Sequence, residues 1–473
     1  MHEIEAALAT DPDAVALLVR RATLLDALGR TTPAIDAYVD VLRREPGHGE
    51  ALANLGTLLF NTGRRSAARL TYEEALRHNG ESVPLLVNLA NALLELGQTA
   101  PARDRYERAL ALDPVCARAH QGLSYALGRL GDEAGAKLHR QRGFAAQPVH
   151  VVPYRGSDAA PTVLVLLCAA GGNVATELFL GDTAFAVVKV FADYYDPSAT
   201  LPGHDVVFNA IGDAEMCGAA LRAASTMTHA HMLPVVNAPA RVARTARVDV
   251  SERCARIPGV VAPRTRLIAR DRFAAECELP TLVRSPGFHT GEHFERIEGA
   301  DGIAAAIASI PGENLLAIEP LDARGTDGRV RKYRVMAIDG ELYPVHLAVA
   351  SHWKVHYFTA DLMHEAIYRE EERAFLNDMA GTLGPAAVAA LREIASALGL
   401  EYAGIDFALD PRGRILLFEA NATMKIVPPD AGPERAYRSA AVERALAAVR
   451  AMVLRRAVAA AAGRANDDPI AGQ

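Results

Sequence analysis

The chain contains little cysteine. Its five cysteines are scattered over 473 residues, at positions 116, 168, 217, 254 and 277, and no C-x-x-C pair occurs. A small disulfide-linked fold needs closely spaced, paired cysteines, and a zinc ribbon needs two C-x-x-C pairs. We therefore expect neither kind of structure.

The chain also lacks a long apolar run and a strong charge excess. Its longest strongly apolar run, residues 163–170, is far shorter than the ~20 residues that span a bilayer. The formal net charge of −7 gives no reason to expect a nucleic-acid or membrane partner. The first residues, MHEIEAALATDPD, lack the basic and apolar regions of a secretory signal. We expect a cytoplasmic protein with neither kind of partner.

A period of 34 residues runs through the first third of the chain. Glycine, tyrosine and alanine recur at this step, in the sets Gly29, Gly63, Gly97 and Gly131; Tyr38, Tyr72 and Tyr106; and Ala34, Ala68, Ala102 and Ala136. A generic helical bundle would not need one fixed period, whereas this period is typical of tetratricopeptide repeats, each a helix–turn–helix. Glycine suits the tight turn between the two helices, because it tolerates positive φ. Residues 1–148 are therefore predicted to form an all-α solenoid of four such repeats.

The sequence pattern changes after residue 148, and a chain of this length is too long for one core. Residues 149–161 mix Pro, Gly and Ser and are predicted to be a linker. In residues 162–240, short apolar strands alternate with helices, which predicts an α/β domain with a parallel sheet. Residues 241–455 have an α+β pattern. The alanine-rich end, residues 456–473, is predicted to be a flexible tail.

The last predicted hairpin carries the strongest chemical signal. Glu419 and Asn421 are two residues apart on one strand and so share a face, and Asp406 can lie on the same face of the neighbouring strand. Two carboxylates and one amide oxygen form a set of hard ligands that suits Mg²⁺ with nucleotide phosphates. A solvated strand face is the alternative, but both strands are otherwise apolar.

With this hairpin, residues 161–455 resemble the ATP-grasp superfamily, and within it the D-alanine–D-alanine ligase and glutathione synthetase type of carboxylate–amine ligase. Asp406 and the Glu419-x-Asn421 pair resemble the family's site for Mg²⁺ or Mn²⁺. The segments HDVVFNAIGD and PVVNAP resemble strands of the family's N-terminal half. The resemblance implies a preliminary α/β domain at 162–240 and two α+β ATP-grasp lobes, at 241–315 and 316–455, that clasp ATP between them.

The resemblance extends to residues that would contact the phosphates of ATP. Arg247 and Arg284 stand where the family carries basic residues, usually lysines, and Gly287 and Gly291 match its glycine-rich loop. Arginine keeps the positive charge and can bind phosphate oxygens bidentately. For Arg284 a surface ion pair is the alternative interpretation.

The segment LLAIEPLD resembles the family's hinge between lobes. There the family binds adenine through backbone groups, here those near Ile318 and Leu321. It binds ribose through an acidic side chain, for which both Glu319 and Asp322 are candidates.

Two further basic residues are the candidate catalytic groups. Lys354 resembles a lysine that reaches the ATP phosphates, and Arg334 matches an arginine facing the same cleft. A charge in an apolar strand is costly unless it is paired, so structural salt bridges are the alternative for both. The neighbouring Arg331 and Lys332 are interpreted as solvated.

The resemblance implies an ATP-dependent ligase that joins a carboxylate to an amine through an acyl phosphate. A non-catalytic ATP-binding scaffold and a kinase of the same fold are the alternatives. The Pro-Gly stretch of dipeptide ligases is missing after Asn421, and Met424 and Lys425 are candidates to line the acceptor pocket instead. The repeats imply a peptide or protein partner on their concave face, or else they pack against the ligase region or a second subunit.

Overall fold

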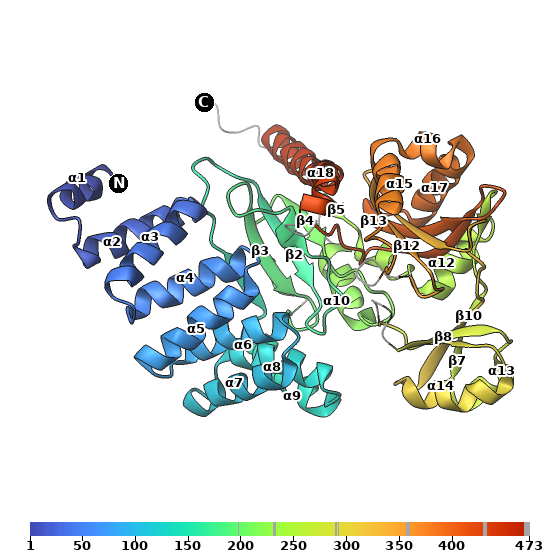
Figure 1. Cartoon of the computed structure of the whole chain (residues 1–473), viewed down its shortest axis with the longest axis horizontal. Coiled ribbons are helices and arrows are strands. Elements are labelled where there is room, and N and C mark those ends of the chain that lie inside the picture. The colour runs from blue at the N-terminus through green and yellow to red at the C-terminus, as the bar shows by residue number, and fades with distance from the viewer. Residues whose placement is uncertain are drawn as a thin grey trace. The chain divides into compact units, whose positions relative to one another are not determined.

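The structure is a computed structural model that describes residues 1–196, 198–229, 233–288, 291, 293–355, 360–428 and 433–467, with side chains up to residue 460 except that of residue 433. The chain forms two compact units (Figure 1). The first comprises residues 1–160 and 182–187, and the second comprises residues 161–181 and 188–473. No helix of the described residues is long and apolar enough to cross a bilayer.

Helices build most of the first unit. They are α1 (His2–Thr10), α2 (Val15–Ala27), α3 (Thr31–Arg44), α4 (Gly49–Asn61), α5 (Arg65–Asn79), α6 (Val83–Glu95), α7 (Thr99–Leu112), α8 (Ala117–Arg129) and α9 (Glu133–Ala146). From α2 onward they form four pairs, and each pair is joined by one of the four periodic glycines in a positive-φ conformation. The predicted helix-pair repeat is therefore confirmed.

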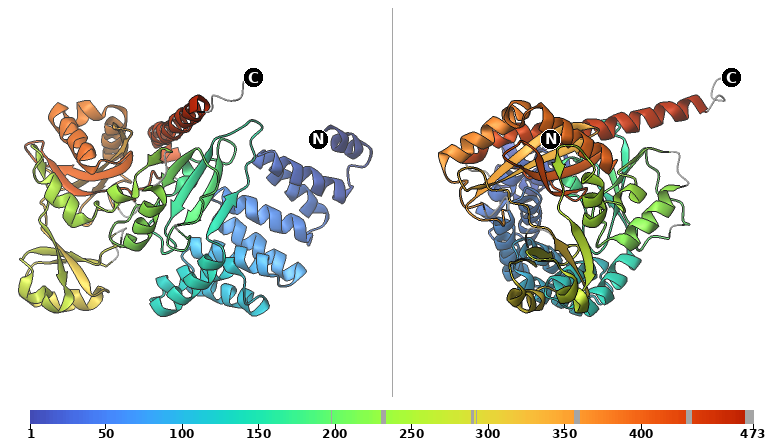
Figure 2. Two further views of the ribbon diagram at one scale, coloured as in Figure 1. Left: turned by 180° about the vertical axis from the view of Figure 1, so that it is seen from behind. Right: turned by 90° about the vertical axis from the view of Figure 1, so that its right-hand side faces the viewer.

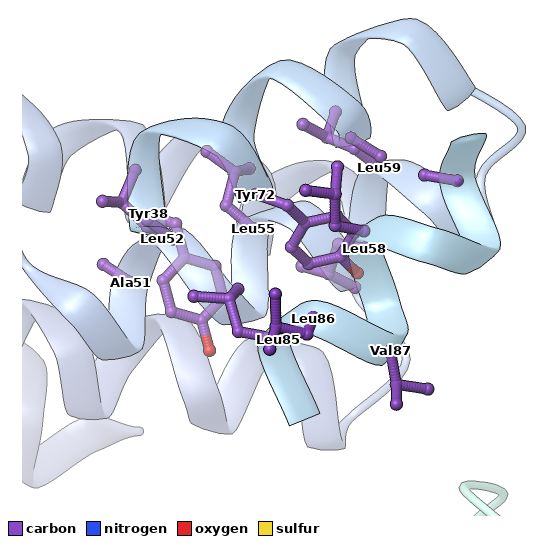
Figure 3. Packing of buried hydrophobic residues seen from close by; sticks show 14 of the residues in the cluster. Tyr38, Ala51, Leu52, Leu55, Leu58, Leu59, Tyr72, Leu85, Leu86 and Val87 are labelled. Atoms are coloured by element: carbon purple, nitrogen blue, oxygen red, sulfur yellow. The ribbon is translucent and has the colours of Figure 1, made fainter. Parts of the chain in front are cut away.

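The periodic tyrosines and alanines form the core of these repeats. Tyr38 and Tyr72 are buried among leucines of the neighbouring helices (Figure 3), and Tyr106 is equally buried. Each tyrosine hydroxyl is hydrogen-bonded to a polar side chain fifteen residues earlier, and the three pairs are Thr23–Tyr38, Thr57–Tyr72 and Asn91–Tyr106. The 34-residue period thus records a repeated core contact and not only a repeated turn.

The predicted linker is partly ordered. Its first residues form strand β1 (Val149–Val152), which the sequence analysis did not predict. Arg155, farther along, forms ion pairs with Asp26 at 3.0 Å and with Asp182 at 2.8 Å. These contacts tie the segment to the first unit.

A largely parallel sheet opens the second unit. Strands β3 (Ala186–Phe191), β2 (Thr162–Leu167), β4 (Val206–Asn209) and β5 (Val235–Val236) are neighbours in that order, and both β2–β4 and β4–β5 are parallel. A short 3₁₀ helix η1 (Thr176–Leu178) and helices α10 (Gly218–His229), α11 (Pro239–Val242) and α12 (Arg247–Cys254) connect or follow these strands. The predicted α/β character of this segment is confirmed.

A four-stranded antiparallel sheet follows. Its order is β7 (Thr265–Ala269), β10 (Asn314–Ile318), β8 (Thr281–Arg284) and β9 (Phe294–Ile297). Helices α13 (Phe273–Glu276) and α14 (Ile303–Ser309) cover one face (Figure 2) and share an apolar core with it, while the 3₁₀ helices η2 (Arg270–Arg272) and η3 (Ala300–Gly302) precede them. The opposite face of this sheet lines the cavity described below.

The third sheet has the order β12 (Glu341–Ala350), β11 (Val330–Ile338), β13 (Tyr402–Leu409), β14 (Ile415–Asn421) and β6 (Val260–Val261). The predicted hairpin turn at Asp339–Gly340 is present, and both residues have positive φ. Helices α15 (Ala366–Asn377), α16 (Met379–Leu383), α17 (Pro385–Leu398) and α18 (Ser439–Asp467), with the 3₁₀ helix η4 (Pro433–Arg438), complete the unit.

The predicted tail differs from the structure in one respect. Helix α18 continues through residue 455, where the flexible tail was expected to begin, and ends at Asp467. Val453 and Ala457 are buried, so apolar packing and not only helix propensity extends this helix. Residues 468–473 lie outside the described residues.

Candidate functional site

A cavity of about 1220 Å³ lies in the second unit. It is lined by β8 and β10 of the four-stranded sheet and by β11, β13 and β14 of the five-stranded sheet. A volume of this size can enclose a ligand as large as a nucleotide, because ligand pockets typically measure about 300–1,000 Å³. Among the predicted site residues, those that line it are Arg247, Arg284, Gly291, Ile318, Glu319, Leu321, Asp322, Arg334, Lys354, Asp406 and Glu419.

Asp406 is the buried centre of one wall. It lies opposite Arg334 on β11 and opposite Glu419 on β14 in the antiparallel register, and it shares a face with Glu419 as the sequence pattern predicted. Arg334 donates two hydrogen bonds to the Asp406 carboxylate, at 2.6 and 2.8 Å, and Lys332 Nζ lies 2.7 Å from Oδ2. Burial alone would raise the pKa of Asp406, but Arg334 and Lys332 together hold that pKa well below its usual range.

Glu419 is held by a second arginine. Arg247, the first residue of α12, donates to Glu419 Oε1 at 2.6 Å and also pairs with Glu215. Burial would lower the pKa of Arg247, but Glu419 and Glu215 reverse that effect and raise it. Glu215 also accepts a hydrogen bond from the Gly287 N–H at 3.0 Å, so the glycine loop is anchored beside Arg247 although Gly287 does not line the cavity.

Arg284 is a buried cation of the cavity with few polar contacts to the described residues. It is only 7% exposed at the end of β8, and it forms no ion pair with a carboxylate of the described residues. It donates to the carbonyl of Phe288 and lies 5.1 Å from the Phe294 ring centre, while its Nε has no hydrogen-bond partner within the described part of the chain. Burial, and then the nearby charge of Arg247, lower the pKa of Arg284 to about 10, so it stays charged at neutral pH.

Lys354 and residues of the predicted hinge segment also line the cavity. Lys354 Nζ donates to the Phe294 carbonyl at 2.9 Å. The Glu319 side chain accepts from Arg264, and its N–H donates to the Arg264 carbonyl at 2.9 Å. Asp322 is paired with Arg324 and is exposed to solvent. Both candidate ribose ligands therefore line the cavity, each beside a basic neighbour.

The cavity contains oxygen ligands of the kind that a hard divalent cation prefers. Asp406 and Glu419 are adjacent carboxylates inside the cavity, which fits such an ion. Asn421 lies just outside the cavity lining, where its Oδ1 accepts from the N–H and hydroxyl of Thr423 and its Nδ2 donates to Glu419 at 3.0 Å. Within the described ranges, no three His, Cys, Asp or Glu side chains converge on one point. The site thus offers two carboxylates directly and one amide oxygen next to them.

One functional contact was missed by the sequence analysis. Lys332 was interpreted as solvated, and this is wrong, because its side chain is 16% exposed and contacts Asp406. Arg331 is not simply solvated either, since it pairs with Asp327 and Glu371. The available signal was the spacing of Lys332 and Arg334, which places both on one face of β11. Met424 and Lys425 do line the cavity, as predicted for the acceptor end.

A smaller groove of about 270 Å³ lies in the first unit. It is lined mainly by the first helices of three successive repeats, α4, α6 and α8, and by His150. Its apolar lining residues include Phe60, Val87 and Leu94, and Arg118 and Glu95 add opposite charges. A groove of this size fits one or two side chains of a partner.

Comparisons with known proteins bear on the first unit. Two family models for the tetratricopeptide repeat match the chain, over residues 19–84 and 63–124. The N-terminal region consists of tetratricopeptide repeats. Such repeats commonly serve protein–protein interaction.

Two solved structures of repeat proteins are similar to about a third of this chain. MamA from Desulfovibrio magneticus RS-1 is 20% identical, with a TM-score of 0.29 over 30% of this chain and 80% of that chain. YrrB, described as a TPR protein with an unusual peptide-binding site, is 20% identical, with a TM-score of 0.29 over 31% of this chain and 75% of that chain. No curated protein was found to match the chain.

Proposed function

We propose that the second unit is an ATP-dependent carboxylate–amine ligase of the ATP-grasp type, and that the repeats hold its peptide or protein partner. One observation carries the ligase proposal. Most of the predicted site residues between positions 247 and 419 line one cavity between two sheets, and they include a buried arginine that has no carboxylate partner among the described residues.

The charge of Arg284 is the strongest support for an anionic ligand. A buried cation without a counter-ion is costly, and a bound phosphate would supply the missing charge and hydrogen bonds. Arg247 and Lys354 line the same cavity. Together these three side chains would neutralise the β- and γ-phosphates of ATP, which is the main requirement of phosphoryl transfer.

The hinge supports a nucleotide in the same cavity. Ile318 and Leu321 line it, and Pro320 between them has no N–H. The Glu319 N–H is already used by Arg264, so the adenine edge would be bound by the Leu321 N–H and by carbonyls of this segment. Glu319 or Asp322 would accept from the ribose hydroxyls.

The chemistry proceeds in two balanced steps. A substrate carboxylate oxygen attacks the γ-phosphorus, the bond from that phosphorus to the β-phosphate oxygen breaks, and an acyl phosphate and ADP result. An amine nitrogen then attacks the acyl carbon, the carbon–oxygen bond to phosphate breaks, and the nitrogen loses a proton. Arg334 would stabilise the negative charge that develops on the acyl group. Mg²⁺ or Mn²⁺ bound at Asp406, Glu419 and Asn421 would supply further charge neutralisation on the phosphates.

The ligase proposal is tested by measuring ADP release with pooled peptides and amino acids, followed by mass analysis of the products. A ligase yields ADP, phosphate and a new amide. A nucleotide-binding scaffold yields no turnover, and a kinase yields ADP with a stable phosphorylated product. Either of the last two results would refute the ligase proposal.

The recruitment proposal rests on the groove between the first helices of the repeats. Arg118 is exposed at this groove, and its guanidinium donates a hydrogen bond to the Asn88 side chain at 3.1 Å. Arg118→Glu would reverse the charge at this position and leave the groove with two acidic residues, Glu95 and the new glutamate, without changing an apolar core residue. We expect a higher KM for the macromolecular substrate and an unchanged Kd for ATP, because a captured partner has a raised effective concentration at the ligase cavity. An unchanged KM would favour a purely structural role for the repeats.

A further inference from the structure

We propose that Lys332 keeps a divalent cation out of the site until a polyphosphate is bound, so that the metal enters only with the nucleotide. This inference rests on the proposed function and concerns the order in which the ligands of that site bind. It assigns a positioning role to a residue that does not belong to the predicted nucleotide or metal set.

The contacts of Asp406 carry the inference. Both carboxylate oxygens of Asp406 are occupied by cations, since Arg334 bonds to Oδ1 and Oδ2 and Lys332 bonds to Oδ2 at 2.7 Å. The Asp406 side chain has no exposed surface of its own, although it lines the cavity. A carboxylate offers about four lone-pair positions, and these three contacts take most of them. A metal ion can therefore bind both oxygens of this carboxylate only if a cation withdraws.

The charges around Asp406 and Glu419 also favour entry of the metal together with a polyphosphate. Arg247, Arg284, Lys332 and Arg334 face Asp406, Glu419, Glu215 and Asp213, so the positive charges balance the negative ones. A bare divalent cation would therefore gain no net attraction there. A bound polyphosphate would make the local field negative and give the lysine another partner.

Lys332 can leave Asp406 more easily than Arg334 can. Arg334 donates two parallel hydrogen bonds to Asp406, and these bonds fix the planar guanidinium. Lys332 makes one contact with Asp406, through a compact charge on a flexible stem. Both side chains lie on the same face of β11, and both line the cavity. The lysine can thus turn toward a phosphate while the arginine keeps the carboxylate in place.

The test measures binding of Mn²⁺ to the full-length protein by electron paramagnetic resonance, with and without a non-hydrolysable ATP analogue. Wild type should bind Mn²⁺ tightly only with the analogue. Lys332→Met should bind free Mn²⁺ at least about tenfold more tightly than wild type, because one unit charge repels a nearby divalent ion by about that factor even with water-like screening.

Arg331→Met is the matched control. Its side chain also belongs to β11 and forms two ion pairs, but with Asp327 and Glu371 and outside the cavity. It should bind free Mn²⁺ like wild type. If Lys332→Met does not fold, Lys332→Gln keeps a polar side chain and removes the same charge, with the same expected gain.

Two results would overturn the inference while leaving the proposed function intact. One is tight binding of free Mn²⁺ by wild type, and the other is equal binding of free Mn²⁺ by wild type and both Lys332 variants. Failure of the nucleotide site on which the proposed function rests gives a different result, because wild type would then not bind the ATP analogue even with Mn²⁺ present. Failure of ligation alone would show in the product analysis and not in Mn²⁺ binding.

Discussion

Arg334 and Asp406 face each other across neighbouring antiparallel strands and are joined by two hydrogen bonds, at 2.6 and 2.8 Å. The pair lies at two irregularities of the sheet, since the register shifts after Arg334 in the β11–β12 pairing and after Asp406 in the β13–β14 pairing. An extra residue in a strand redirects the side chains beside it. The local backbone thus sets this pair where β11, β13 and β14 line the cavity.

Asp406→Asn should destabilise the second unit at neutral pH. It removes the counter-ion of Arg334 and Lys332, and breaking a buried ion pair from one side costs roughly 3–5 kcal/mol. Urea unfolding followed by the fluorescence of Trp353, the single tryptophan, reports on this unit. Equal stability of variant and wild type at pH 7 would mean that Asp406 is not held by these cations in solution.

The difference between wild type and Asp406→Asn should depend on pH. The folded pKa of Asp406 lies below its unfolded value of about 3.9, so its stabilisation is complete above that value and is lost as the pH falls through the folded pKa. The two free energies of unfolding should therefore differ most near neutrality and converge below about pH 4. A constant difference down to low pH would contradict this account.

Arg284→Met should separate stability from binding. Arg284 is buried and has no ion pair among the described residues, so replacing its charge with an apolar side chain should leave the free energy of unfolding unchanged or raise it by about 1–3 kcal/mol. The stabilisation by Mg²⁺-ATP, about 2.7 kcal/mol at a ligand concentration of 100 Kd, should be lost. Thermal unfolding with and without nucleotide measures both effects. A destabilised variant that still responds to nucleotide would show that Arg284 is structural.

Glu419→Gln should abolish ATP turnover without unfolding the protein. Loss of this carboxylate leaves phosphate charge uncompensated, and we expect at least about a 100-fold fall in ADP release. Glu215→Gln is the matched control, because Glu215 also pairs with Arg247 but does not line the cavity, and its turnover should stay within about tenfold of wild type. Circular dichroism verifies the fold of each variant. Similar losses of turnover in Glu419→Gln and Glu215→Gln would mean that both substitutions act by displacing Arg247.

Two glycines of α8 should respond in opposite directions to alanine. A Cβ at Gly122 would overlap the Tyr106 ring, whereas a Cβ at Gly128 would only touch the Ala136 side chain at 3.9 Å. Gly122→Ala should therefore destabilise the repeats by about 1–3 kcal/mol. Gly128→Ala should stabilise them by about 0.5–1 kcal/mol through helix propensity. The free energies of unfolding of the full-length variants are measured by circular dichroism. Destabilisation by both substitutions would contradict the packing of Gly122 and Gly128 described here.

The repeats could be predicted almost completely from the sequence, because each recurring residue makes the same contact in its own repeat. A shared face for Asp406 and Glu419 was also predictable, but the turn alone does not place them opposite each other, because the hairpin register shifts by one residue between Asp406 and Phe407. The Lys332–Asp406 contact was not predictable, because it depends on how β11 pairs with a strand about 70 residues away. Strand β1 was missed because its four residues adjoin a Pro/Gly/Ser segment.

Trapping of an activated carboxylate is the most direct test of the proposed ligase. The full-length protein is incubated with Mg²⁺-ATP, pooled amino acids and peptides, and hydroxylamine, which replaces the natural amine. The account predicts hydroxamate in amounts equal to ADP, dependent on Mg²⁺ and absent in Glu419→Gln. Formation of ADP without any hydroxamate, or a stable phosphorylated product in its place, would contradict the account.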